Sequence, residues 1–366
     1  MHLPYQSPDQ VLTALKASGA HTSLWLLCVA DRHAAALPEL LEACRAAGLR
    51  VCGGLFPGLI VGPQHINEGL LAIPLPDDSL VAIATLELHQ LRWLTPLPPL
   101  PSAQDASSLI LVDCLAPNIS LMLEQLYDTY GNLLPHCGAG TGFHDLRNVP
   151  SVFTQDGFFP SAGLVVIQPR KLTVRVRHGW HRVRGPFVAS RTRGSVIQDM
   201  NWEPAGPFYR RLVASQNPEL ADKPIFPDQN SNYPLCFSKE GSEDVMRDPM
   251  RITDDNEVVT LSEVPENSLL YLAHGDRHSL VAAARQAVED CGMPQDVERC
   301  FVSNCFSRAL MLKETFHEEL EAVCAAISEF TAVRPEGVLA LGEIAANGKQ
   351  SLEFFNKTIV IALSHS

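Results

Sequence analysis

A cysteine and an arginine stand three positions apart in a setting where both could take part in chemistry. Cys305 closes the apolar run that begins at Cys300, and Arg308 follows it by three residues. Ligands of open α/β sheets bind at the carboxyl ends of strands, so a thiol here is a candidate nucleophile or ligand contact. A neighbouring guanidinium would favour the thiolate form. Nucleophilic catalysis would also need a base close in space, so a buried and inert thiol is the alternative interpretation.

Glu343 is the most conspicuous single carboxylate of the chain. It lies inside the apolar segment Leu339–Ile344. Burial of an unpaired carboxylate is costly, so the sequence predicts either a cationic partner or a ligand amine beside it. Arg308 and Arg247 are the candidate partners.

Two imidazoles and an indole occur within residues 178–181. Alternation along an extended chain places His178 and Trp180 on one face, and Gly179 between them permits a close approach. A face with an imidazole and a large aromatic ring suits an aromatic or porphyrin ligand. Packing at the end of a strand is the alternative role for the same residues.

The elements that must position these residues recur three times along the chain. Each copy has an apolar strand, an amphipathic helix, a glycine-bearing turn and a further apolar strand. Helix ends and tight turns need glycine for structural reasons, and no turn has the pattern of a known phosphate loop. The expected strands and helices are Leu24–Val29 with Leu37–Ala47, Leu109–Cys114 with Ile119–Leu134, and Cys300–Cys305 with Phe316–Phe330, and the glycine-bearing turns are Cys52–Gly58, Cys137–Gly142 and Leu341–Ile344.

The sequence predicts an α/β protein made of two mixed-sheet α/β domains. A chain of 366 residues exceeds what one core usually organises. Repeated units must also bury their apolar faces against one another. The predicted domains are residues 1–186, which contain two strand-helix-Gly turn-strand units, and residues 187–366, which contain the third.

Composition excludes several classes of protein. A hydrophobic fraction of 46% and a charged fraction of 19% are typical of a soluble globular chain, and a net charge of −13 argues against nucleic-acid binding. No apolar run of about 18 residues and no signal-peptide pattern occur, so we expect a cytoplasmic protein without a membrane span. The ten cysteines are spread along the chain without Cys-x-x-Cys spacing, which predicts reduced thiols rather than disulfides or a zinc site.

Several separated segments, in their order and spacing, resemble the FIST family, with its amino-terminal and carboxy-terminal halves covering nearly the whole chain. One departure is the apolar Leu55–Pro57 after the first Gly-Gly pair, where many members carry hydroxyl residues. This difference favours an apolar or planar ligand at that turn. The segments that carry the resemblance are Gly53–Gly54 before Gly69–Leu71, His178–Trp180, Tyr233–Leu235, Arg247–Pro249, Cys305–Arg308, Gly342–Ile344 and Phe355–Thr358.

The resemblance implies a bacterial sensory protein that binds a small ligand and controls a separate signalling enzyme, such as a histidine kinase or a cyclic-di-GMP enzyme. Some stand-alone members of similar length resemble haem-dependent nitric-oxide sensors. A haem-binding version would use His178 as the axial ligand, with Cys305 as the second choice. The predicted ligand-binding residues are His178, Trp180, Arg247, Cys305, Arg308, Glu343 and Asn356.

Two other interpretations stay open at this stage. One is an enzyme that uses Cys305, Arg308 and Glu343 on a small amine or acyl compound, although no recognised catalytic signature accompanies them. The other is a scaffold whose repeated units serve assembly alone. The sequence leaves the ligand, the partner and the oligomeric state open.

Overall fold

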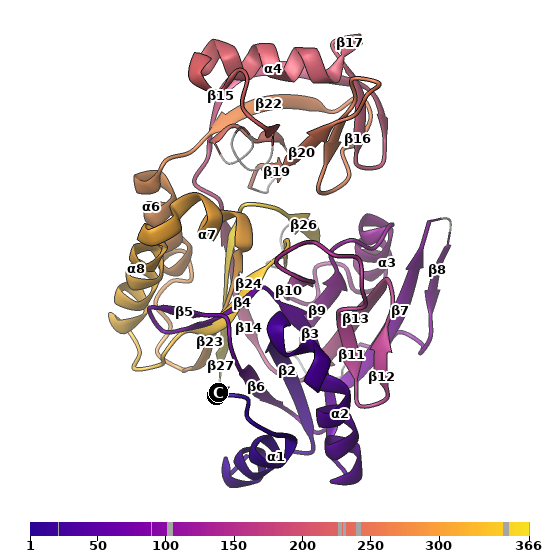
Figure 1. The fold of residues 1–366 in the computed structure, drawn as a ribbon. Helices are drawn as coiled ribbons and strands as arrows, with labels where there is room; N and C mark the ends of the chain where they lie inside the picture. The colour runs from indigo at the N-terminus through magenta and orange to yellow at the C-terminus, as the bar shows by residue number, and fades with distance from the viewer. Residues whose placement is uncertain are drawn as a thin grey trace.

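The computed structural model shows a mixed α/β architecture of four sheets, which confirms the predicted fold class. It describes residues 1–366 except 21, 89, 101–104, 226–228, 230–231, 239–242, 347–350 and 366. Figure 1 shows three of the sheets gathered in the lower part of the molecule and the fourth above them.

Each predicted repeat forms the same sheet core. Two parallel strands are joined by a helix, and a third strand pairs antiparallel with the first of them. The amphipathic helices bury one face, as α2 does with Leu37, Leu40, Leu41 and Cys44. The three cores are β2 (Leu24–Ala30), α2 (Leu37–Ala46), β3 (Arg50–Phe56) and β6 (Leu70–Leu75); β9 (Ser107–Asp113), α3 (Ile119–Tyr130), β10 (His136–Thr141) and β13 (Ala162–Gln168); and β23 (Val297–Cys305), α8 (Phe316–Ser328), β24 (Glu336–Ala340) and β27 (Ile359–His365).

Hairpins exchanged between the units complete the sheets. The hairpin that follows the second strand of each unit leaves its own sheet and pairs with the second strand of another unit. The exchange is cyclic, because the first unit completes the third, the third completes the second, and the second completes the first. The hairpins are β4 (Gly58–Val61) with β5 (Gln64–Ile66), β11 (Val152–Thr154) with β12 (Gly157–Phe159), and β25 (Glu343–Ala346) with β26 (Glu353–Phe355).

A second exchange involves the strand that follows each unit. β7 (Leu80–Glu87), which continues into β8 (Gln90–Trp93), pairs with β13 of the second unit, and β14 (Leu172–Arg177) pairs with β27 of the third. The corresponding place beside β6 is taken by β1 (His2–Leu3) from the start of the chain. The three units therefore interlock as a closed ring of strand pairings.

Equivalent glycines mark the three units, although not where the sequence analysis placed them. Gly53 and Gly138 lie within β3 and β10 rather than in turns, and the equivalent residue of the third unit is Gly337 rather than Gly342. A Cβ atom on Gly53, Gly138 or Gly337 would lie 1.9, 2.1 or 1.9 Å from a carbonyl oxygen of the neighbouring parallel strand. These glycines are required because the backbones of neighbouring strands approach closely within the sheets. In the sequence alone, a glycine in such a segment is indistinguishable from a glycine in a turn.

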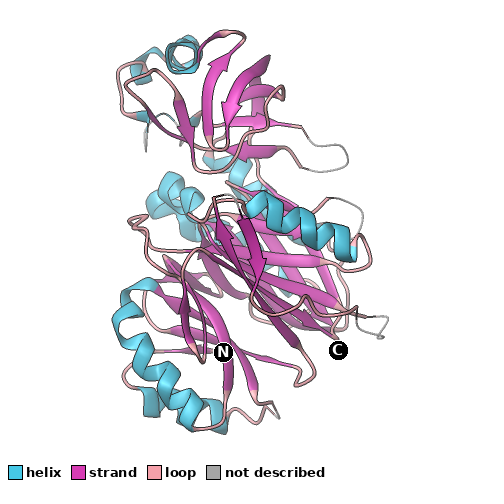
Figure 2. Cartoon of the chain, turned by 90° about the vertical axis from the view of Figure 1, so that its right-hand side faces the viewer, coloured by secondary structure: helices cyan, strands magenta, loops and turns pink. Residues whose placement is uncertain are grey.

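The fourth sheet is inserted between β14 and the third unit. Its strands are mostly antiparallel, and Figure 2 shows it as a separate layer above the three unit sheets. Helix α4 (Ala205–Gln216) packs on it, and α6 (Arg277–Glu289) leads from it back to the third unit, beginning at a capping box of Asp276 and Ser279. The strands are β15 (His181–Arg193), β16 (Val196–Met200), β17 (Glu203–Pro204), β18 (Leu235–Phe237), β19 (Val245–Arg247), β20 (Pro249–Ile252), β21 (Val258–Thr260) and β22 (Leu269–His274).

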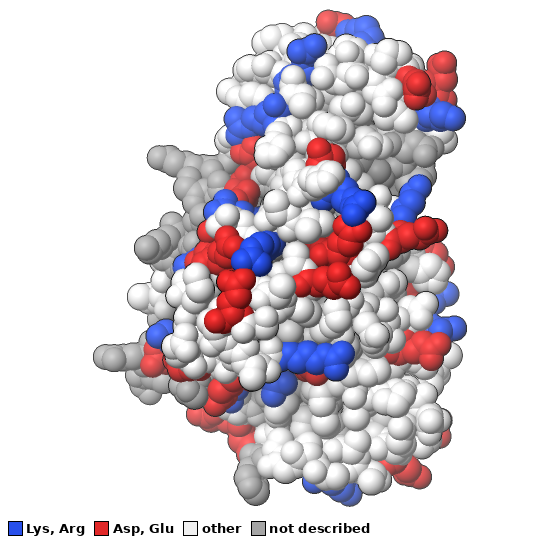
Figure 3. Space-filling model, turned by 90° about the vertical axis from the view of Figure 1, so that its left-hand side faces the viewer, with Lys and Arg blue, Asp and Glu red and all other residues white. Residues whose placement is uncertain are grey.

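The predicted division near residue 186 falls inside β15, and strands from both sides of it share two sheets. β14 and β4 belong to the sheet of the third unit, and β25 and β26 extend the sheet of the second. Two further helices are α1 (Pro8–Ala17) and α7 (Phe306–Leu312). On the face shown in Figure 3, basic side chains lie among acidic ones rather than in one continuous basic strip.

The glycines at the parallel strand pairs predict a large and specific effect on stability. Gly337→Ala places a Cβ against the Val302 carbonyl oxygen, so we expect it to lower the free energy of unfolding by about 2–3 kcal/mol or more, measured by urea denaturation. Gly48→Asn is the control, because Gly48 has no atom within 4 Å of its Cβ position and asparagine tolerates a positive φ. Equal stability of the two variants would contradict the close-approach explanation.

Candidate ligand-binding site

The predicted site residues of the third unit meet at the carboxyl end of β23. Cys305 is the last residue of β23, Glu343 is the first of β25, and residues 356–358 lead into β27. The Cys305 amide donates to the Thr358 carbonyl at 3.0 Å, which brings the first and third of these segments together. The strand pairing of the unit therefore places a thiol, a carboxyl and an amide side by side.

Glu343 is fully buried and half satisfied. Its Oε2 accepts from the Thr358 amide at 3.1 Å and from the Thr358 hydroxyl at 2.7 Å. Its Oε1 has no hydrogen-bond partner among the described residues, and the Cys305 thiol lies close enough to interact with the carboxyl group. Burial raises the pKa of Glu343 to about 8, so the carboxyl is largely protonated at neutral pH.

Asn356 presents a second unsatisfied group in the same region. It is fully buried, and neither its amide nitrogen nor its amide oxygen has a partner among the described residues. Buried polar atoms are nearly always hydrogen-bonded in proteins. Glu343 and Asn356 together thus leave three buried polar atoms without a partner among the described residues.

An ion pair joins the inserted sheet to this region. Asp248, directly after β19, lies 3.0 Å from Lys357 Nζ, and both side chains are buried. Burial raises the pKa of Asp248, and the charge of Lys357 opposes that shift. Arg247 next to it is also buried, and it donates to the carbonyl oxygens of Glu263 at 2.6 Å and Phe354 at 3.3 Å. The inserted sheet and the third unit thus both contribute residues to this region.

Arg308, one of the two candidate partners of Glu343, pairs with Glu319 instead. Its guanidinium forms a bidentate pair with Glu319, at 2.8 and 3.1 Å, and both side chains have no exposed surface. The remaining donors bind the carbonyl oxygens of His178, Leu280 at 3.0 Å and Lys357 at 3.0 Å. All directions of the guanidinium are occupied, so Arg308 fastens the site instead of facing a ligand.

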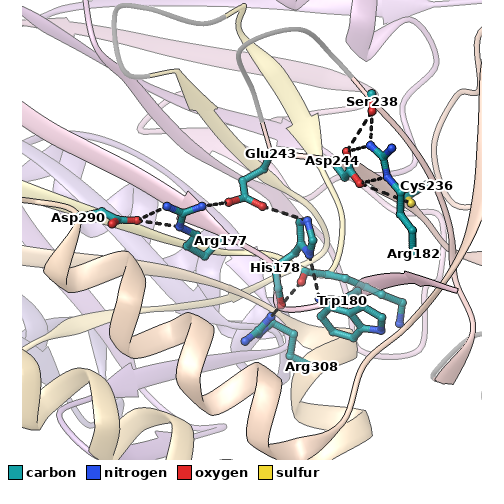
Figure 4. A network of polar contacts seen from close by, with 11 residues as sticks. Arg177, His178, Trp180, Arg182, Cys236, Ser238, Glu243, Asp244, Asp290 and Arg308 are labelled. Carbon is teal, nitrogen blue, oxygen red and sulfur yellow. Dashed lines mark hydrogen bonds and ion pairs between the residues drawn. The ribbon is translucent and has the colours of Figure 1, made fainter.

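His178 and Trp180 form the connection between β14 and the inserted sheet. His178 Nδ1 accepts from the Trp180 amide at 2.8 Å, and its Nε2 lies 2.9 Å from a carboxylate oxygen of Glu243. Figure 4 shows the chain of contacts that continues from Glu243 through Arg177 to Asp290. Glu243 belongs to the inserted sheet region, so this network ties that body to the third unit.

Trp180 is the packing centre of this connection. Arg308 and Lys357 lie over its rings, with cation-to-centroid distances of 5.4 and 5.2 Å. Gly275, just after β22, is so close that a Cβ there would lie 3.0 Å from the indole. The segment that enters the inserted sheet and the segment that leaves it therefore lie side by side at Trp180, next to Lys357.

The predicted haem ligands do not fit that cofactor in this arrangement. Both ring nitrogens of His178 are engaged, one by a backbone amide and one by Glu243. The Cys305 thiol is 3% exposed, and burial raises its pKa far above the ordinary value. Within the part of the chain that the structure describes, no group of three or more His, Cys, Asp or Glu side chains is placed to hold a metal ion.

Two family models match most of the chain, and the boundary between them lies within the inserted sheet. The FIST N domain matches residues 24–203, and the FIST C domain matches residues 205–346. This chain belongs to the FIST family. FIST domains are associated with small-ligand binding in signal transduction. A comparison with curated proteins finds no match, and none of the described helices has the length and apolar character needed to span a membrane.

Several residues of this FIST site were missed from sequence. Four residues that were not predicted contact predicted ones, namely Lys357, Thr358, Glu319 and Glu243, and Asp248, also not predicted, pairs with Lys357. Lys357, Thr358 and Asp248 lie inside segments on which the family resemblance rests, so a signal existed for them. Glu319 lies on the amphipathic helix α8, and the sequence pattern does not distinguish its buried carboxylate from the exposed ones on the same helix.

The Arg308–Glu319 pair predicts a large loss of stability when one partner is removed. Arg308→Met leaves the Glu319 carboxylate buried without a cation, so the free energy of unfolding should fall by about 3–5 kcal/mol. Arg277→Gln breaks the matched surface pair with Glu318 and should cost about 0.2–1 kcal/mol. Chemical denaturation of both variants checks this, and similar small losses would show that Arg308 is dispensable.

Glu343 predicts a pH dependence of stability. Its pKa is near 4.5 in the unfolded chain and about 8 when folded, so its contribution is full below pH 4.5 and is lost as the pH rises to about 8. Glu343→Gln cannot ionise, and its melting temperature relative to the unmodified protein should therefore increase between pH 5 and pH 8.5. A difference that is constant with pH, measured by thermal unfolding, would contradict a raised pKa.

Proposed function

We propose that this FIST protein is a sensor that binds a small amine-bearing molecule at Glu343 and Asn356. The observation that carries this proposal is the group of three buried polar atoms, Glu343 Oε1 and both amide atoms of Asn356, that have no partner among the described residues. A ligand ammonium would take the proton's place at Glu343, because a neighbouring positive charge favours the ionised carboxylate. The Asn356 amide would orient the remaining polar groups of the ligand.

Comparison of the three units supports a functional role for Glu343. Glu343 pairs with Ala139, the residue that follows the shared glycine of the second unit. The equivalent positions in the other hairpins are Leu59, opposite Val338, and Val152, opposite Gly54. The fold accepts an apolar side chain at this place twice, so a carboxyl is not needed there for the strand exchange.

The inserted sheet is the proposed route by which binding becomes a signal. Asp248 comes from that sheet and reaches Lys357, while Trp180 at its connection to β14 packs against the same lysine. A positively charged ligand near Glu343 would change the electrostatic energy of this ion pair. It would therefore bind more tightly to the protein with the inserted sheet in one position than in another. Differential affinity for two conformations is what a sensor requires.

The output we propose is a change in affinity for a separate signalling enzyme, such as a histidine kinase. This partner and a cytoplasmic location remain predictions of the sequence. The enzyme interpretation has less support, because the Cys305 thiol is buried with a raised pKa and Arg308 is fully engaged. We propose no haem step, since His178 would first have to release Glu243.

Amine binding should release a proton and depend on Glu343. A thermal-shift screen of primary amines at pH 7, followed by calorimetry in two buffers with different heats of ionisation, measures both affinity and proton release. We expect Glu343→Gln to weaken binding at least about tenfold and to abolish proton release. Glu203→Gln on the surface of the inserted sheet is the control and should bind normally. Binding without proton release, or binding unchanged in Glu343→Gln, would refute the proposed site.

A further inference from the structure

A cavity lies between the three unit sheets, away from Glu343. The centre of a water-sized sphere can occupy about 50 Å³ of it, which is more than the roughly 10–15 Å³ that one water needs. First strands of all three units line it, with Leu26 of β2, Leu109 and Leu111 of β9, and Phe301 of β23. Apolar cavities of this kind stay dry and take up apolar molecules.

Polar residues line this cavity at one end only. Gln168 closes β13, Arg299 lies near the start of β23, and Ser364 lies near the end of β27 and pairs with Arg299. Strand register places Phe301 and Ala362 two residues deeper, about 7 Å from that level. Leu111 lies four residues from Ser107, the partner of Gln168, and is therefore about 13 Å deep. The cavity is a short apolar tube with a polar mouth.

The mouth carries two guanidinium groups with spare donors. Arg170 Nη1 lies 3.0 Å from Glu298, and Arg299 Nη1 lies 3.9 Å from Glu336, which is too far for a hydrogen bond. Burial lowers the pKa of Arg299, the charges of Glu336 and Glu298 oppose that shift, and the nearby charge of Arg170 adds to it. Ser364 is 7% exposed, and its hydroxyl has no partner among the described residues.

We propose that this cavity binds a short aliphatic monocarboxylate. Its carboxylate lies between Arg170 and Arg299 with the Ser364 hydroxyl as a further donor, and its alkyl chain fills the tube toward Leu111. The anion accepts hydrogen bonds from the guanidinium donors that Glu298 and Glu336 leave free, and the alkyl chain removes its apolar surface from water. This site is at the amino ends of β2, β9 and β23, whereas Glu343 is at their carboxyl ends, so the two sites are distinct.

The test is a calorimetric titration of the whole chain with each saturated carboxylate from butyrate to octanoate. We expect affinity to rise about fourfold for each added methylene until the tube is full, and then to stop rising. Hexanol should bind at least about tenfold more weakly than hexanoate, because it lacks the charge that the arginines recognise. No binding of any member, or equal binding of hexanol and hexanoate, would overturn the proposal.

Two variants locate the bound carboxylate. Ala362→Leu fills the tube and should shorten the longest chain that is accommodated, while Arg299→Gln should weaken every member about tenfold with the chain-length limit unchanged. Arg211→Gln, on helix α4 that packs on the inserted sheet, is the control and should match the unmodified protein. Arg299→Gln keeps the proposal testable if Ala362→Leu fails to fold, and unchanged affinity in Arg299→Gln would overturn it. Glu343→Gln should have no effect, which separates this result from the amine site.

Discussion

The exchange of hairpins between units is the constraint on which the rest of the structure depends. No unit completes its own sheet, because each second strand needs the hairpin of another unit as its neighbour. The exchange works only if the parallel strand pairs lie close together, and Gly53, Gly138 and Gly337 provide that approach. One buried apolar cluster accordingly contains residues of all three units, and neither half of the chain has complete sheets without the other.

Interlocking of this kind creates two ends where three units meet, and the ends have diverged. At the carboxyl ends of the first strands, the third unit carries Cys305 and Glu343, while the equivalents of Glu343 in the other units are Leu59 and Val152. At the amino ends, the units together enclose an apolar tube with two arginines at its mouth. The three units thus share the same arrangement of strands and differ in the side chains at single equivalent positions.

Buried charge is concentrated where the inserted sheet joins this frame. Arg308 with Glu319 and Lys357 with Asp248 are both withdrawn from solvent, and both cations lie over Trp180. A buried ion pair adds little net stability compared with apolar packing, but removal of one partner is costly. Such pairs therefore hold one specific placement of the inserted sheet and make that placement sensitive to a new charge nearby.

The sequence by itself determined the repeat order, the helices and strands of each unit and the family, because these depend on local periodicity and short motifs. Tertiary structure alone decided which carboxylate each cation meets: Arg308, one of two candidate partners for Glu343, is paired with Glu319, and Lys357 is paired with Asp248 across more than a hundred residues. It also decided that the glycines lie inside strands and that the units exchange hairpins. The physical reason is that local patterns record the conformation of a segment and its exposed or buried face, whereas charge pairing and strand exchange depend on which distant segments the closed ring of sheets brings together.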